Sequence, residues 1–170
     1  NLFTTPLFTR YIKKNLKNKN LICVSPDVGG VQRTRGLATK INVDLAIIDK
    51  RRLQPGKSQV MRIIGNVQNK ECIIVDDIID SGGTIVNAVD ALIREGAKSV
   101  YVFVTHAVLS GEAINKIKKS KINKLIITDS IDNTKKIKNV SKIQVLSIAP
   151  LMAEAIKRIS NSTSVSSLFN

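Results

Sequence analysis

Short apolar runs alternate with amphipathic segments along most of this chain. Runs rich in Leu, Ile and Val predict buried strands at 21–24, 45–48, 60–64, 72–75, 100–105, 125–128 and 145–148. Apolar residues at helical spacing predict helices at 5–16, 31–41, 84–94, 112–119 and 150–159. Continuously apolar strands that alternate with helices are typical of a mostly parallel sheet with helices on both faces. We therefore expect an α/β fold in which residues 1–170 form one domain.

Ligands of such sheets bind beyond the carboxyl ends of the strands, so the segment after residues 72–75 is informative. It reads DDIIDSGGT, from Asp76 to Thr84. Its glycines allow backbone N–H groups to turn toward an anion, and a helix N-terminus adds a positive dipole end. A phosphate alone would be repelled by carboxylates, but carboxylates accept hydrogen bonds from the vicinal hydroxyls of a ribose.

The segment therefore predicts a sugar-phosphate site. We expect the hydroxyls at Asp76 and Asp77, and Asp80 to cap the turn or hold a phosphate-bound water. Thr84 is expected to cap the following helix. The predicted phosphate ligands are Ser81, Gly82, Gly83 and Thr84.

Charge and composition narrow the range of partners. The chain has 27 Lys and Arg against 13 Asp and Glu, a net charge of +14, which attracts phosphorylated ligands, nucleic acid or anionic membranes. The lysine-rich stretches read as solvated faces and loops, and no aromatic residue is interleaved with them, so a nucleic-acid partner is not expected. No apolar run approaches the roughly 18 residues of a membrane helix, and no secretory leader is visible. Cys23 and Cys72 lie in apolar runs, which predicts buried, reduced thiols and a cytoplasmic location.

Several motifs together carry a family resemblance. The segments VSPDVGGVQRTRGLA, AIIDKRR, IIGNV, VDDIIDSGGT, THAVLSGEA and MAEAIKRIS come in the order found in ribose-phosphate pyrophosphokinases. The resemblance runs from about Leu2 to Phe169 and covers the C-terminal half of that family, whose N-terminal half is absent here. It implies a type I phosphoribosyltransferase-like fold.

The resemblance also implies an activity and its residues. The family transfers the diphosphoryl group of ATP to the 1-hydroxyl of ribose 5-phosphate, giving phosphoribosyl pyrophosphate and AMP. By resemblance Lys50 is catalytic, Arg52 contacts the transferred group and the sugar phosphate, and Asp27 binds Mg²⁺. The loop from Asp76 to Thr84 becomes the ribose 5-phosphate site. The tail residues Ser164, Ser166 and Phe169 resemble part of an allosteric site for phosphate and ADP in a homohexamer.

Local alternatives exist for these residues. Asp27 also suits a turn after Pro26, the basic stretch 50–58 suits a solvated loop that cannot hold regular structure, and the tail suits a frayed end. His106 is expected to be structural, and Asp129 has no assigned role.

Other functions also stay open. A phosphoribosyltransferase that uses phosphoribosyl pyrophosphate is disfavoured by the basic stretch 50–52. A non-catalytic or degenerate subunit and a basic nucleic-acid-binding domain remain alternatives. We expect this chain alone to be inactive or weakly active.

Overall fold

One seven-stranded sheet organises the molecule. The computed structural model describes residues 2–17, 20–51 and 60–169. The sheet has the order β3-β2-β1-β4-β5-β6-β7, and every neighbouring pair is parallel except β2 and β3. The strands are β1 (Leu21–Ser25), β2 (Asp44–Arg51), β3 (Val60–Ile64), β4 (Glu71–Ile79), β5 (Ser99–Ala107), β6 (Lys124–Thr128) and β7 (Ile143–Leu146). The predicted mostly parallel α/β fold is confirmed.

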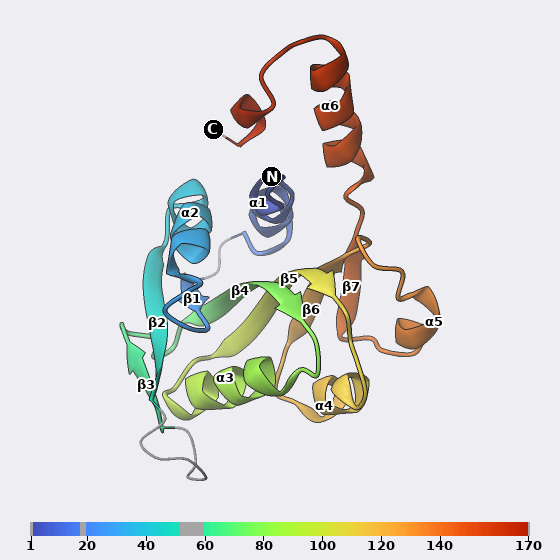
Figure 1. Cartoon of the computed structure of the whole chain (residues 1–170). Helices are drawn as coiled ribbons and strands as arrows, with labels where there is room; N and C mark the ends of the chain where they lie inside the picture. The colour runs from blue at the N-terminus through green and yellow to red at the C-terminus, as the bar shows by residue number, and fades with distance from the viewer. Residues whose placement is uncertain (1, 18–19, 52–59, 170) are drawn as a thin grey trace.

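Helices cover both faces of the sheet (Figure 1). The helices are α1 (Thr5–Asn15), α2 (Val31–Ile41), α3 (Gly83–Arg94), α4 (Ala113–Lys119), α5 (Thr134–Ile137) and α6 (Ala149–Ser160). α1 and α2 lie on one face, where Phe8, Ile12 and Leu37 pack against the sheet. α3 and α4 lie on the other face, where Leu92 and Ile117 join a second buried cluster. Because the central strands are buried on both faces, their carboxyl ends form a rigid edge on which a site can be built.

β2 and β4 extend furthest beyond the ranges that the sequence pattern predicts. β2 continues through Asp49, Lys50 and Arg51, because β3 runs antiparallel beside it and pairs Lys50 with Met61. The prediction that regular structure stops before Lys50 is therefore wrong for residues 50 and 51. β4 continues to Ile79, because it pairs with β5 as far as Ala107. The adjacent acids Asp76 and Asp77 are thus strand residues.

The last part of the chain differs more from the prediction. β7 ends at Leu146, two residues before the predicted end, and Ile148 becomes the residue that precedes α6. The one-turn helix α5 was not predicted. Its four residues are too few for a helical periodicity. Asp132, just before its N-cap residue Asn133, accepts from the backbone N–H and the hydroxyl of Thr134 at 2.9 and 2.7 Å. α6 projects away from the sheet, and the tail folds back from its end through the 3₁₀ turn η1 (Ser166–Leu168) (Figure 1).

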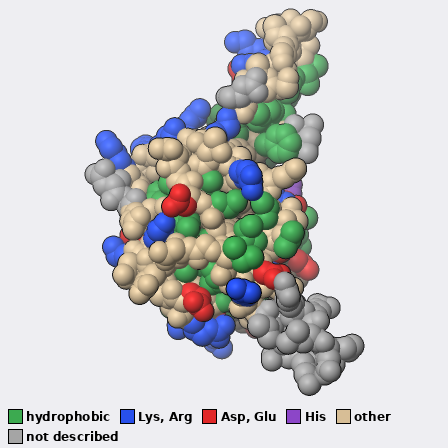
Figure 2. Space-filling view, turned by 90° about the vertical axis from the view of Figure 1, so that its left-hand side faces the viewer, with side chains coloured by type: hydrophobic (Ala, Val, Ile, Leu, Met, Phe, Trp, Pro, Cys, Tyr) green, Lys and Arg blue, Asp and Glu red, His purple; other side chains and the backbone are tan. Residues whose placement is uncertain are grey.

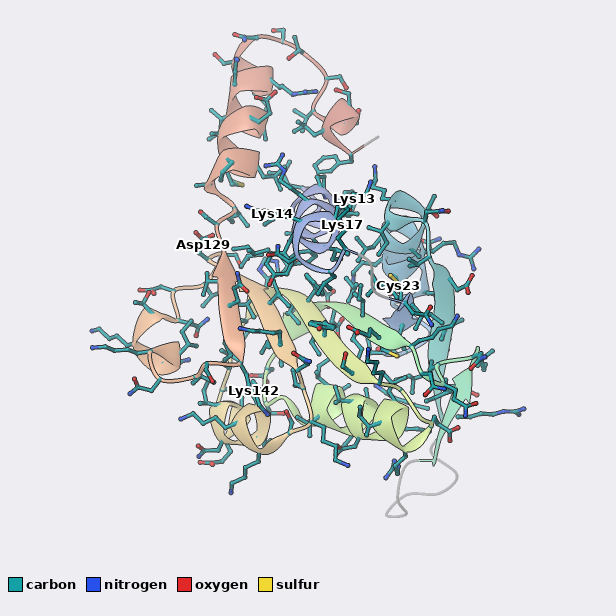
Figure 3. The ribbon with its side chains drawn as sticks, turned by 180° about the vertical axis from the view of Figure 1, so that it is seen from behind. Lys13, Lys14, Lys17, Cys23, Asp129 and Lys142 are labelled. Atoms are coloured by element: carbon teal, nitrogen blue, oxygen red, sulfur yellow. The ribbon has the colours of Figure 1, made fainter. Side chains whose placement is uncertain are left out.

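Lysines of the described part of the chain lie on both sides of the sheet. Figure 2 shows blue lysine and arginine side chains scattered over the face at the β2 edge. Figure 3 shows Lys13 and Lys14 on α1 and Lys17 just after it, whereas Lys142 lies beside α4 across the sheet. The Lys142 ammonium donates to the carbonyl of Lys118 at 3.0 Å and to that of Ser120, so this lysine ties down the end of α4. Among the described helices, none has the length and apolar character needed to cross a membrane.

Candidate functional site

The glycine turn after β4 lies beside a small hollow at the carboxyl edge of the sheet. Gly82 adopts φ +74°, a left-handed conformation, and α3 begins at the next residue. The hollow has a volume of about 190 Å³, and its lining includes every residue of the segment 76–84 that was predicted to bind the sugar phosphate, except Asp77. They are Asp76, Asp80, Ser81, Gly82, Gly83 and Thr84. A helix N-terminus beside a left-handed glycine presents backbone N–H groups to an anion.

The start of α3 has no side-chain cap. Gly82 is the N-cap residue, so Thr84 is the second residue of the helix and does not cap it as predicted. The reason is that the helix begins one residue earlier than the apolar spacing suggests. Because no side chain caps this helix end, its first N–H groups can serve a ligand instead.

Arg33 of α2 joins the two adjacent acids of β4. Its Nη1 donates to Asp76 Oδ1 and its Nη2 to Asp77 Oδ2, both at 2.8 Å. The backbone N–H groups of Asp77 and Ile78 also donate to these carboxylates, to Asp76 Oδ1 and Asp77 Oδ1, each at 2.9 Å. The Asp76 side chain is 18% exposed, whereas that of Asp77 is 59% exposed. One cation therefore holds two carboxylates that differ strongly in their access to water.

The two carboxyls respond to this environment in opposite directions. Burial raises the pKa of Asp76, and its hydrogen bonds from the Asp77 backbone and from Arg33 offset only part of that increase. Burial also acts to raise the pKa of Asp77, but its hydrogen bond with Asp76 and the charge of Arg33 outweigh it, so that pKa is lowered. Asp77 is therefore the acid that ionises more readily, whereas Asp76 depends on Arg33 to stay ionised.

Asp77 faces a different hollow from Asp76. This larger hollow, about 740 Å³, lies between α1, α2 and the sheet, and its lining includes Arg33, Thr105 and His106. The Nδ1 atom of His106 is 3.0 Å from the Ser130 hydroxyl, which donates to the carbonyl of Thr105 at 2.9 Å. Because that hydroxyl proton is already used, His106 Nδ1 is the donor to Ser130. The predicted hydroxyl ligands Asp76 and Asp77 thus line two different hollows and share Arg33.

Asp27 lies in the turn between β1 and α2. Its Oδ1 accepts the backbone N–H of Gly30 at 2.8 Å, and its carbonyl accepts the Ser25 hydroxyl at 2.6 Å. This is the geometry of the aspartate turn that the sequence offered as an alternative to a metal ligand. Within residues 2–17, 20–51 and 60–169 there is no group of three acidic, histidine or cysteine side chains that could hold a metal ion. A single carboxylate fits Mg²⁺ only where phosphate oxygens and water complete its shell.

Of the two predicted catalytic residues, Lys50 lies toward the edge of the sheet. Lys50 is on β2, two strands from β4 in the sheet order, near the end of the pairing between β2 and β3. Arg52 falls outside the described residues. The described part of the chain therefore brings Asp76, Asp80 and the glycine turn together, and Lys50 stands apart from them.

The tail forms an ordered feature next to α6. Arg158 donates through Nη1 to the carbonyl of Ser164 at 2.9 Å and to the Ser167 hydroxyl. The hydroxyls of Ser164 and Ser166 lie 3.0 Å apart, and the Phe169 ring packs edge-on against Phe3 at 5.5 Å. A hollow of about 330 Å³ beside the tail is lined by Glu154, Lys157, Arg158, Asn161, Thr163, Ser164 and Ser167.

The thiols and Asp129 have structural environments. Burial raises the pKa of both Cys23 and Cys72 to about 12, so both are protonated thiols at neutral pH. Asp129 Oδ1 accepts the backbone N–H of Ile148 at 2.8 Å, and Figure 3 shows Asp129 below the start of α6. Burial acts to raise the pKa of Asp129, but hydrogen bonds from Ser147 and Ile148 outweigh it and lower that pKa. Asp129 therefore secures the start of α6.

Three cations at these sites were not singled out from the sequence. They are Arg33, Arg158 and Lys116, whose ammonium donates to the carbonyl of Ser81 at 3.2 Å. Arg33 had a usable signal, since it follows the Gly29-Gly30 turn on a helix that must cover the neighbouring strand. Lys116 and Arg158 had none, because each is one of many basic residues at helical spacing.

Comparison with known proteins gives close relatives. Residues 49–170 match the family described as the phosphoribosyl synthetase-associated domain. A ribose-phosphate pyrophosphokinase from Granulibacter bethesdensis is 52% identical over 170 residues, which are 100% of this chain and 55% of that protein. The chain thus spans about half the length of the curated relatives it matches.

Solved structures agree with this relationship. The crystal structure of phosphoribosylpyrophosphate synthetase from Mycobacterium smegmatis matches with a TM-score of 0.84 and 36% identity, over 94% of this chain and 51% of that one. A purine phosphoribosyltransferase from Pyrococcus horikoshii matches with a TM-score of 0.53 and 20% identity, over 64% of this chain and 73% of that one, which shows a shared fold alone. The family match over residues 49–170 decides the assignment: the chain belongs to the phosphoribosyl synthetase-associated domain family.

Proposed function

We propose that this chain carries the ribose 5-phosphate site of a ribose-phosphate diphosphokinase. That enzyme transfers the diphosphoryl group of ATP to the 1-hydroxyl of ribose 5-phosphate, giving phosphoribosyl pyrophosphate and AMP. The observation that supports it most is the hollow in which Asp76, Asp80 and the left-handed turn at Gly82 meet the N-terminus of α3. The turn suits the 5-phosphate, and the carboxylates suit the sugar hydroxyls.

Charge is the main catalytic requirement of this reaction. Negative charge accumulates on the transferred group, so cations that meet it in the transition state lower the barrier. In this proposal Lys50 supplies a point charge, and Arg52 adds a second cation that can bind two oxygens at once. Asp27 would hold Mg²⁺ together with substrate oxygens, and the ion would neutralise charge on the phosphates. Because Lys50 is two strands from β4, it would contact the phosphates of the bound nucleotide and not the sugar itself.

The remaining parts of the proposal concern the whole protein. The nucleotide site, a homohexameric assembly and regulation by phosphate and ADP require more than this chain, which spans 55% of its relative from Granulibacter bethesdensis. We propose a cytoplasmic enzyme, because phosphorylated sugars and ATP are cytoplasmic metabolites and both cysteines are free and buried.

Ligand-dependent melting tests the sugar site. Ribose 5-phosphate at millimolar concentration should raise the melting temperature by several degrees, because it binds the folded state and not the unfolded chain. Ribose without the phosphate should give a much smaller shift. Asp76→Asn should reduce the ribose 5-phosphate shift by more than half, because the amide places a donor where the hydroxyl needs an acceptor.

A matched variant separates the site from general charge effects. Asp90→Asn removes an aspartate from α3 away from the glycine turn and should leave the shift unchanged. If neither ribose 5-phosphate nor phosphoribosyl pyrophosphate shifts melting of the folded wild-type chain, the proposal of a sugar-phosphate site is wrong.

A further inference from the structure

Two adjacent carboxylates create an electrostatic difficulty at a site for an anionic ligand. Asp76 places one negative charge at the hollow of the glycine turn, and the adjacent Asp77, which faces the neighbouring hollow, adds a second. A sugar phosphate brings nearly two more. The Arg33 guanidinium bridges both carboxylates at 2.8 Å and is itself 33% exposed, so it neutralises part of this charge where it arises. The ligand then meets a site with about one net negative charge among these three groups.

Arg33 also fixes which carboxylate oxygens a ligand can use. Two hydrogen bonds reach Asp76 Oδ1, one from Arg33 and one from the backbone N–H of Asp77. The hydrogen bonds from Arg33 and from the Asp77 backbone thus leave Asp76 Oδ2 to accept a hydroxyl proton, in competition with the contact between the Asp76 and Asp77 side chains. Asp76 lines the hollow of the glycine turn, so this second oxygen belongs to the carboxylate that faces the predicted phosphate site.

We propose that Arg33 is a positioning residue of the sugar site: it keeps Asp76 and Asp77 ionised and orients Asp76 so that its second oxygen accepts a sugar hydroxyl. This inference rests on the proposed function and adds a residue to that site. Arg33 acts through the two carboxylates, and the sugar need not touch it. A planar guanidinium suits this role because its parallel N–H groups bind two oxygens at a fixed spacing.

Other charged groups lie near the triad of Arg33, Asp76 and Asp77 and affect the test. Asp80 shares the hollow of Asp76, His106 shares the hollow of Asp77 and Arg33, and Asp27 lies in the turn that precedes α2. Imidazole is the side-chain group that ordinarily changes charge between pH 5 and 8. The measurements below are therefore repeated with His106→Gln, so that a pH effect of the triad is separated from one of the imidazole.

The test measures ribose 5-phosphate binding by calorimetry between pH 5.5 and 8.5. The phosphate of the ligand titrates near pH 6, so the useful quantity is the ratio of the variant Kd to the wild-type Kd at each pH. For Arg33→Gln we expect a ratio on the order of tenfold or more at pH 5.5, since Asp76 loses its cationic partner and gains a proton more easily. The ratio should fall as the pH rises, because Asp76 is then ionised without help.

Two further variants sharpen the result. Arg33→Lys keeps the charge but not the two-point geometry, and should give a smaller ratio that varies little with pH. Arg35→Gln removes an exposed arginine two residues away and should give a ratio near one at every pH. A ratio for Arg33→Gln that is independent of pH, equal to that of Arg35→Gln, or below one would overturn the proposal. A ratio below one would mean that Arg33 competes with the sugar.

A ligand-free measurement distinguishes failure of this inference from failure of the proposed function. The carboxyl carbons of Asp76 and Asp77 can be titrated by NMR in the folded chain without any sugar. Arg33→Gln should move the Asp76 titration to higher pH, whereas Arg35→Gln should not. If wild-type chain binds no ribose 5-phosphate, the proposed function fails, and this titration still decides whether Arg33 holds the acids ionised. An unmoved Asp76 titration overturns the role of Arg33 whatever the ligand does.

Discussion

Gly82 shows how one backbone angle creates the candidate site. Its φ of +74° lies in the left-handed region, which costs a residue with a Cβ about 1 kcal/mol or more. Its added Cβ would still find space, because the nearest atoms are those of Ala113 at 3.8 Å. Gly82→Ala should therefore lower the free energy of unfolding by about 1 kcal/mol through backbone strain. Chemical denaturation of both proteins measures this difference.

Gly83 is a matched control for the same turn. It is the first residue of α3, and no atom lies within 4 Å of the Cβ that alanine would add. Gly83→Ala should leave stability unchanged or raise it by about 0.4–1 kcal/mol, because alanine restricts the unfolded chain. Gly82→Ala should also reduce the melting shift by ribose 5-phosphate. Equal effects of the two substitutions on stability would contradict a special role for the left-handed residue.

At the scale of elements, the start of α6 is held by a hydrogen bond to a residue at the end of β6. Asp129, just after β6, accepts the N–H of Ile148, where β7 turns into α6. Asp129→Ala should raise the hydrogen-exchange rate of the Ile148 amide and the first turn of α6 roughly five- to tenfold. The lowered pKa of Asp129 gives the sign with pH. The stabilisation that ionised Asp129 contributes is complete above the ordinary aspartate pKa of about 3.9. It is lost as the pH falls through the lower pKa that Asp129 has in the folded chain.

Asp132 offers a control three residues away. Its carboxylate accepts from Thr134 at the start of α5, so Asp132→Ala should loosen α5 and leave the Ile148 amide protected. The prediction for Asp129 is wrong if both variants expose α6 equally, because the effect would then come from the whole loop between β6 and β7.

The strands also show which parts of the fold a sequence pattern can predict. Continuous apolar runs such as Ile73 to Val75 predicted the central strands, because a strand that is buried on both faces needs apolar side chains at nearly every position. The ends of β2 and β4 could not be predicted, since pairing with β3 and β5 holds polar residues in the strand there. The glycine turn was predicted with its acids because those residues are contiguous. The bridge from Arg33 to Asp76 spans 43 positions in sequence and requires the fold.

At the scale of the whole molecule, the two ends of the described chain meet. Phe3 lies before α1 and Phe169 follows η1, yet their rings pack edge-on with centroids 5.5 Å apart. Arg158 holds the intervening tail through Ser164 and Ser167. The projecting helix α6 also exposes three large apolar side chains, those of Met152, Ile156 and Ile159. The tail is therefore built into the structure and does not have the contacts of a frayed end.

The last prediction follows from this ordered tail. The hydroxyls of Ser164 and Ser167 and the cations Lys157 and Arg158 line one hollow, together with Glu154. Hydroxyls and cations are groups that bind phosphate. In a full-length family enzyme that contains this chain, removing residues 164–170 should raise the phosphate concentration for half-maximal activation by at least about fivefold. Inhibition by ADP should weaken similarly, while the KM for ribose 5-phosphate stays within about twofold. Steady-state kinetics at several phosphate and ADP concentrations measure all three, and Phe169→Ala, which keeps the serines, should have the smaller effect. A truncated enzyme with unchanged responses to phosphate and ADP would show that the tail only packs against Phe3 and Arg158.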